Sequence, residues 1–80
     1  MAADVLRPET HPLVRYGERR GWSRQQTADF FEVPFSTFKQ LVSGHTGASF
    51  TRAEGWETRS GGEVLAVEVM HWQRRNRKAA

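Results

Sequence analysis

The sequence contains no cysteine, which excludes disulfide bonds and metal sites built on thiolates. It also shows no secretory leader pattern and no apolar run long enough to cross a membrane, so we expect a cytoplasmic protein without a membrane partner. With 80 residues, the chain predicts one small domain with no room for a deep catalytic cleft in a single subunit. Its 38% hydrophobic content, including three Trp and five Phe, is still sufficient for a folded core.

Acidic residues are absent from the end of the chain. Residues 73–80 hold four of the 12 basic residues and no acid, whereas the other eight basic residues share residues 1–72 with all nine acidic ones. The net charge of +3 indicates an anionic partner. Composition alone leaves a second interpretation open, in which residues 74–80 are only a solvated basic tail.

The first part of the chain predicts an arm followed by a helix. Residues 1–10 lack hydrophobic periodicity, and we expect a flexible N-terminal arm there. Residues 11–20 predict the first helix, because Pro12 suits its first position and Leu13 and Tyr16 form an apolar stripe. The folded domain is expected to cover residues 11–73.

The rest of the chain is organised around residues 23–44, which predict two short helices joined by a tight turn. The segment Ser-Arg-Gln-Gln at its start is a capping box. Ala28 is small enough to let a second helix cross closely, and Val33 is expected to point from the turn into the core. Pro34 cannot lie inside a helix, so the next helix begins at or just after it.

The helix expected at residues 34–43 has two different faces. Phe38 and Leu41 lie three apart and define the inward face. The outward face combines a hydroxyl, an amide, an ammonium group and an aromatic ring, which suit hydrogen bonding and apolar contact with base edges. The alternative is that they are ordinary surface residues. The candidate base-reading residues are Phe35, Ser36, Lys39 and Gln40.

The second half predicts two further helices and an apolar edge. Residues 51–60 predict a helix with a capping box at Thr51, preceded by Phe50 as in a hydrophobic staple. Residues 64–72 fit a helix at about residues 66–75, although their β-branched run leaves a strand open. The apolar edge looks too large for an 80-residue monomer to bury. We therefore expect a homodimer interface at Leu65, Val69, Met70 and Trp72.

No catalytic constellation is evident. His11, His45 and His71 are scattered, and none shares a helical face with a second potential metal ligand. The sequence has no phosphate-binding glycine loop and no spacing that indicates an activated nucleophile. We expect no enzymatic activity, metal, cofactor or small-molecule substrate.

The segment from Arg24 to Gly44 resembles the lambda-repressor-like helix-turn-helix family, which includes Cro and CI-type repressors and XRE-type regulators. The resemblance extends to a first helix ending before Trp22-Ser23 and to a late glycine pair, Gly61-Gly62. Within the motif, the small residue, the turn hydrophobe and the two helix core positions are Ala28, Val33, Phe38 and Leu41. This resemblance implies an all-α, compact four- to five-helix domain.

The motif departs from the family pattern at four positions. Glu32 stands at the usual turn glycine, which predicts either a strained backbone or a slightly different turn there. Pro34 replaces the usual Ser or Thr cap, and Arg24 stands where Gln is common. Phe35 is unusual at a base-reading position.

The resemblance also implies function and contacts. It places the candidate base-reading residues in the major groove of double-stranded DNA and implies phosphate contacts from Arg24, Gln25, Ser43, His45 and Thr46. It indicates a phage- or mobile-element-like homodimeric transcriptional repressor that binds a palindromic operator, with recognition helices about 34 Å apart. Two alternatives stay open: an architectural or recombination accessory protein that binds DNA, and a protein-interaction adaptor that reuses the fold.

Overall fold

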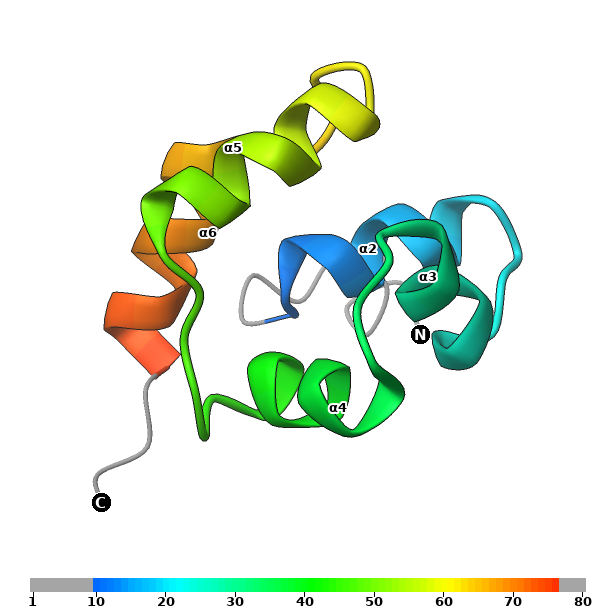
Figure 1. Cartoon of the computed structure of the whole chain (residues 1–80), viewed down its shortest axis with the longest axis horizontal. Helices are drawn as coiled ribbons and strands as arrows, with labels where there is room; N and C mark the ends of the chain where they lie inside the picture. The colour runs from blue at the N-terminus through cyan, green and yellow to red at the C-terminus, as the bar shows by residue number, and fades with distance from the viewer. Residues whose placement is uncertain (1–9, 77–80) are drawn as a thin grey trace, which may run out of the picture.

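The computed structural model describes residues 10–76, and these residues form five α-helices and no β-strand. The helices are α2 (Pro12–Arg19), α3 (Arg24–Phe30), α4 (Phe35–Ser43), α5 (Phe50–Arg59) and α6 (Ala66–Asn76) (Figure 1). The prediction of a small all-α domain with four to five helices is confirmed. None of these helices is long and apolar enough to cross a membrane. The predicted N-terminal arm, apart from Thr10, lies outside the described residues, as do residues 77–80 of the predicted basic tail.

Helix α2 lies in the middle of the molecule, between α4 and the pair formed by α5 and α6 (Figure 1). Its first residue is Pro12, as predicted, and Leu13 and Tyr16 are buried. The Tyr16 ring packs against Phe30 and Phe31, with ring centroids 5.6 and 5.2 Å apart. The core therefore forms around the apolar side of α2, which packs against α3 and α6, and α3 in turn packs against α4.

The connection between α3 and α4 follows the sequence prediction closely. Both hydrogen bonds of the capping box are present, with Ser23 Oγ 3.1 Å from Gln26 N and Gln26 Oε1 2.8 Å from Ser23 N. The Val33 N–H donates to the Ala28 carbonyl at 2.9 Å, and both side chains are buried. Pro34 is the N-cap of α4, so a proline at the start of this helix is compatible with the fold.

Glu32 adopts the left-handed backbone conformation in this turn. Its φ of 58° is the only positive φ of a non-glycine residue within residues 10–76. In this conformation the Cβ atom crowds the following carbonyl oxygen. The strain predicted at this position is confirmed. The Glu32 carboxylate lies 3.5 Å from Arg59 Nη2, but it is 74% exposed, so water screens the ion pair.

Replacing Glu32 with glycine is expected to raise the free energy of unfolding by about 1 kcal/mol, because glycine has no Cβ to crowd the carbonyl. Thermal or urea unfolding measures this change. Glu32→Gln is the matched control, since it removes the ion pair and keeps the side chain in the left-handed region. The control should change stability by less than about 0.5 kcal/mol. A glycine variant no more stable than wild type would show that the turn is not strained.

Helix α5 begins earlier than predicted. Ser49 is the N-cap, and its Oγ accepts from the Arg52 N–H at 3.1 Å, so the predicted cap at Thr51 is wrong. Phe50 becomes the first helical residue and is 46% exposed, which excludes the predicted staple. The physical reason is that either hydroxyl can cap a helix, and the earlier one lengthens a helix that buries Ala53 and Trp56.

Helix α6 settles two open points. The strand alternative for residues 64–72 is wrong, because the chain is helical from Ala66 to Asn76. The helix also includes residues 74–76, which the sequence pattern placed in a basic tail. The Ala66 N–H donates to Glu57 Oε1 at 2.9 Å, and this bond attaches the start of α6 to α5.

The predicted dimer interface needs correction at two residues. Val69 is fully buried and Trp72 is 3% exposed, because α6 packs this face on α5 and α2. The Trp72 ring lies edge-on against His11, with ring centroids 4.6 Å apart. Both side chains belong to the core of the chain and leave no surface for a second copy. Leu65 is 40% exposed and Met70 is partly buried, so these two remain accessible.

Candidate functional site

The outward side of α4 brings the four candidate base-reading residues together. Phe38 and Leu41 are 0% and 1% exposed, so they anchor α4 to the core and turn its opposite side outward. We call this exposed side the α4 face, and it consists of Phe35, Ser36, Lys39, Gln40 and Ser43. All five residues lie on one helix at spacings of three and four, which align them along one surface.

Phe35 is held in place at the start of the α4 face. Its ring stacks on Phe38 with centroids 6.5 Å apart and an interplanar angle of 13°. The side chain is nonetheless 36% exposed. Lys39 Nζ lies 5.5 Å from the centre of the same ring, which gives a cation–π contact. The face therefore presents an ordered aromatic ring beside an ammonium group.

The end of α4 is closed by its own backbone. Gly44 has a φ of 86° and ends the helix in the left-handed conformation. The N–H groups of His45 and Thr46 donate to the Gln40 carbonyl at 3.0 and 3.3 Å. The helix end therefore already uses two loop N–H groups that could otherwise donate to phosphates. Only the side chains of His45 and Thr46 are left for an external ligand.

Ser43 and His45 form a pair at this end of the helix. Ser43 Oγ donates to the Gln40 carbonyl at 3.2 Å and lies 2.8 Å from His45 Nδ1. This pair orients the exposed imidazole next to the α4 face.

The start of α3 carries the other predicted phosphate contacts. Arg24 is exposed and has no ion-pair partner within residues 10–76. Gln25 is also exposed, but its Nε2 donates to Asp29 Oδ1 at 3.0 Å. Arg24 is therefore free for an anion, whereas Gln25 would have to leave Asp29.

The ion pairs divide the basic residues into two groups. Four arginines on α2 and α5, or just after α2, have acidic partners: Arg15 with Glu68, Arg19 and Arg20 with Glu63, and Arg59 with Glu32. The basic residues without an acidic partner in the described range are Arg24, Lys39, Arg52, Arg74 and Arg75. Residues 33–53, which include all of α4, contain no Asp or Glu. The α4 face therefore lies in an acid-free segment, although residues 1–72 hold eight basic and nine acidic residues.

A polar contact that sequence reasoning missed attaches α6 to the loop after α4. The Ala48 N–H donates to Gln73 Oε1 at 2.6 Å, and Gln73 Nε2 donates to the Ala48 carbonyl at 3.2 Å. One side-chain amide thus satisfies both backbone groups of Ala48. No sequence pattern marks this contact, because the two residues are far apart in the chain and a lone glutamine carries no spacing signal.

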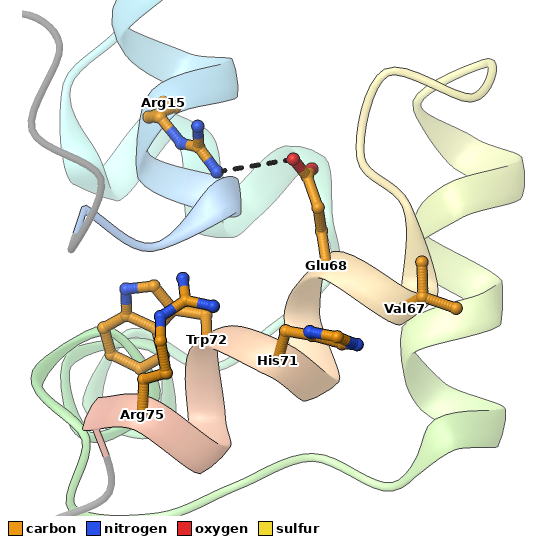
Figure 2. A pocket seen from close by; sticks show the side chains of 6 residues that line it. All are labelled: Arg15, Val67, Glu68, His71, Trp72 and Arg75. Carbon is orange, nitrogen blue, oxygen red and sulfur yellow. Dashed lines mark ion pairs between the residues drawn. The ribbon is translucent and has the colours of Figure 1, made fainter.

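The described residues also contain a shallow cavity of about 380 Å³ beside α6, away from the α4 face. It is lined by Arg15, Val67, Glu68, His71, Trp72 and Arg75 (Figure 2). Arg15 Nη2 lies 3.8 Å from Glu68 Oε2 across it (Figure 2). The Glu68 carboxylate is thus paired with the Arg15 guanidinium.

The histidines do not come together in the fold. His11 is buried at the start of α2, whereas His45 and His71 are exposed on the α4 loop and on α6. Within residues 10–76, no group of three or more His, Asp or Glu side chains is placed to hold a metal ion. Comparison of the chain with protein-family models, with curated proteins and with solved structures finds no match. Functional inference therefore rests on the α4 face and its surroundings.

Proposed function

We propose that this chain is a sequence-specific double-stranded DNA-binding protein that regulates transcription, with α4 as the helix that enters the major groove. The observation that carries the proposal is the α4 face. It presents an amide, an ammonium group, two hydroxyls and an aromatic ring on one anchored helix, within a segment that has no acidic residue. An α-helix fits the width of the major groove, where each base pair displays a distinct pattern of donors, acceptors and methyl groups.

Four side chains of the α4 face have chemical counterparts on base edges. The Gln40 amide suits the N6 and N7 positions of adenine, and the Lys39 ammonium suits guanine O6 and N7. The Phe35 ring suits a thymine methyl group, and the Ser36 hydroxyl can donate or accept. Phe38 and Leu41 hold the helix rigidly enough to keep these groups in register.

Phosphate contacts would position this helix in the groove. Arg24 is the strongest candidate because its guanidinium has no acidic partner within residues 10–76. The side chains of Gln25, Ser43, His45 and Thr46 complete the proposed set. Such contacts fix the register of the protein on the duplex and make the affinity depend on salt concentration.

We further propose that the chain acts as a homodimeric repressor, which blocks a promoter by occupying a palindromic operator. The accessible apolar side chains near the start of α6 are Leu65, Val67 and Met70, with Leu65 40% and Val67 55% exposed. They replace the larger interface predicted from sequence. A two-fold dimer would place two α4 helices about 34 Å apart on successive major grooves. Sedimentation of the protein with and without duplex DNA tests this arrangement.

Replacing Gln40 with alanine is expected to weaken binding to the preferred sequence by about 1–3 kcal/mol, roughly 5- to 150-fold, and to relax the choice at one base pair. The preferred sequence would first be selected from a random duplex pool with the wild-type protein. Competition binding against single-base variants then gives the specificity at each position. Glu54→Ala, at an exposed position on α5, is the matched control and should keep the wild-type preference.

The outcomes of this experiment separate three functions. A large specificity ratio that Gln40→Ala reduces at one position supports the regulator. An equal loss on all sequences would contradict the placement of Gln40 at a base edge. Salt-dependent binding without sequence preference would indicate an architectural or recombination accessory protein. Absence of DNA binding would favour a protein-interaction adaptor, for which the exposed ring of Phe35 is the most suitable contact.

A further inference from the structure

We propose that the C-terminal turn of α6 is a second phosphate-contacting element, with Arg74 as its principal donor. This inference rests on the proposed DNA-binding function and adds a part of the chain outside the two-helix motif. It would extend the contact with the duplex beyond the base pairs that α4 reads.

The first observation is the position of α6 relative to the loop after α4. The Gln73 amide makes two hydrogen bonds to the backbone of Ala48, which lies between α4 and α5. A bond from a side chain to both backbone groups of one residue restrains the distance and the orientation of the two segments. Helix α6 runs along one side of the molecule toward the level of α4, so that its last turn lies next to this loop (Figure 1).

The second observation is the direction of the side chains in that turn. Trp72 points into the core and Gln73 points toward the loop. Successive residues of an α-helix are rotated by about 100°, so Arg74 lies beyond Gln73 on the outer side of α6. Arg75 lines the cavity with Trp72 and Arg15 on the other side of the helix (Figure 2). Arg74 is therefore exposed on the outer side of α6, and it follows directly after Gln73, which points toward the loop.

The third observation is charge. Arg74 is exposed and has no acidic partner within residues 10–76, and the neighbouring segment 33–53 has no acid. Arg19, the last residue of α2, is in contrast paired with an acid, because its Nη1 atom lies 4.0 Å from Glu63 Oε2. A DNA backbone would thus find an unpaired guanidinium at Arg74 beside the loop that follows α4.

A competing explanation is that Arg74 only stabilises α6. Cations in the last turn of a helix interact favourably with the partial negative charge at its C-terminus. This effect changes the stability of the free protein and does not depend on DNA. A phosphate contact, in contrast, releases counterions and changes how strongly the affinity depends on salt.

The test compares Arg74→Gln with Arg19→Gln in the full chain, because both substitutions change the net charge equally. Binding to the selected duplex and to an unrelated duplex is measured between about 50 and 200 mM NaCl. Each phosphate contact contributes about 0.9 to the slope of log affinity against log salt. We expect Arg74→Gln to reduce this slope by about 0.9 on both duplexes. Raising the salt from about 50 to 200 mM would then weaken binding of the variant by a factor roughly three- to fourfold smaller than the factor for wild type. Arg19→Gln should keep the wild-type slope.

A third variant, Gln73→Leu, tests the positioning of the turn. It removes both hydrogen bonds to Ala48 and leaves Arg74 in the sequence. Because the last turn of α6 is then no longer held beside the loop, we expect a smaller slope of log affinity against log salt than in wild type. Thermal unfolding of each variant confirms that it is folded at the assay temperature. An unchanged slope for Arg74→Gln, with Gln40→Ala still losing specificity, would overturn this inference and leave the proposed function standing. Absence of wild-type binding to any duplex would overturn both.

Discussion

Replacing Gly17 with alanine is expected to lower the free energy of unfolding by about 3 kcal/mol, the upper end of the usual cost of overpacking a core. Gly17 lies where α2 crosses α3. A Cβ atom at this position would lie 1.9 Å from Thr27 Oγ1 and 3.0 Å from Thr27 Cβ. Thr27 is buried and its hydroxyl donates to the Ser23 carbonyl at 2.9 Å, so the side chain cannot simply rotate away without losing that bond. Urea unfolding of both proteins measures the difference.

Gly55 provides a matched control within the same fold. It lies inside α5, and a Cβ atom there would meet no atom within 4 Å. Gly55→Ala is therefore expected to stabilise the protein by up to about 1 kcal/mol, through helix propensity and reduced freedom of the unfolded chain. Opposite signs for the two substitutions would show that the crossing, rather than glycine itself, matters at Gly17.

A double-mutant cycle tests the assigned cause. In a Thr27→Ala background the hydroxyl is absent, so Gly17→Ala should cost less than half of its effect in wild type. An equal cost in both backgrounds would mean that Thr27 is not the obstacle.

Lowering the pH from about 7 to about 4 is expected to remove about 3 kcal/mol of unfolding free energy through His11 alone. His11 is 1% exposed and caps α2, where its Nδ1 accepts from the Leu13 N–H at 3.0 Å. Its Nε2 is buried without a hydrogen-bond partner in the described residues. Burial, and to a smaller extent the positive charge of Arg15, lowers the pKa of His11 from 6.5 to about 3.

The sign follows from where the proton binds. Above pH 6.5 the imidazole of His11 is neutral in both states, and its contribution is fully present. Between pH 6.5 and about 3 the unfolded chain takes up a proton that the folded chain does not. Stability therefore falls as the pH falls, by about 1.4 kcal/mol for each pH unit in this window.

His11→Asn isolates this effect, because asparagine keeps a cap acceptor and cannot titrate. Its stability at neutral pH should be lower than that of wild type, since the smaller side chain loses contact with Trp72. Between about pH 6.5 and 4.5, however, its unfolding free energy should depend less steeply on pH than that of wild type. The difference between the two slopes should be about 1.4 kcal/mol per pH unit. Equal slopes for wild type and His11→Asn would contradict the assignment.

Local signals predicted most of the elements correctly. The capping box at Ser23 and the start of α4 after Pro34 depend on groups within a few residues of one another. The buried positions of α4 follow from spacing alone. One helical turn takes about 3.6 residues, so apolar residues three or four apart lie on the same side of the helix. The same spacing exposes Phe35, Ser36, Lys39 and Gln40 on one side, so the membership of the α4 face was predictable.

Errors arose where two local solutions were equally good. Ser49 and Thr51 are both suitable caps, and in the structure the Ser49 hydroxyl caps the helix by accepting from the Arg52 N–H. The apolar run in α6 fits either a dimer surface or an internal core. Packing on α5 and α2 buries Val69 and Trp72, which leaves Leu65 and Met70 for any external contact.

The sequence by itself determined the helices, the anchoring of α4 and the residues on its outer side, because these depend on periodicity and on caps within one turn. It also determined that residues 33–53 lack acidic side chains. Only the tertiary structure decided which basic groups are neutralised and that Gln73 holds the end of α6 beside the α4 loop. It also decided that Gly17 has no room for a Cβ atom and that burial lowers the pKa of His11. These features join residues that are distant in the chain, and their energies depend on distances and burial that no local pattern encodes.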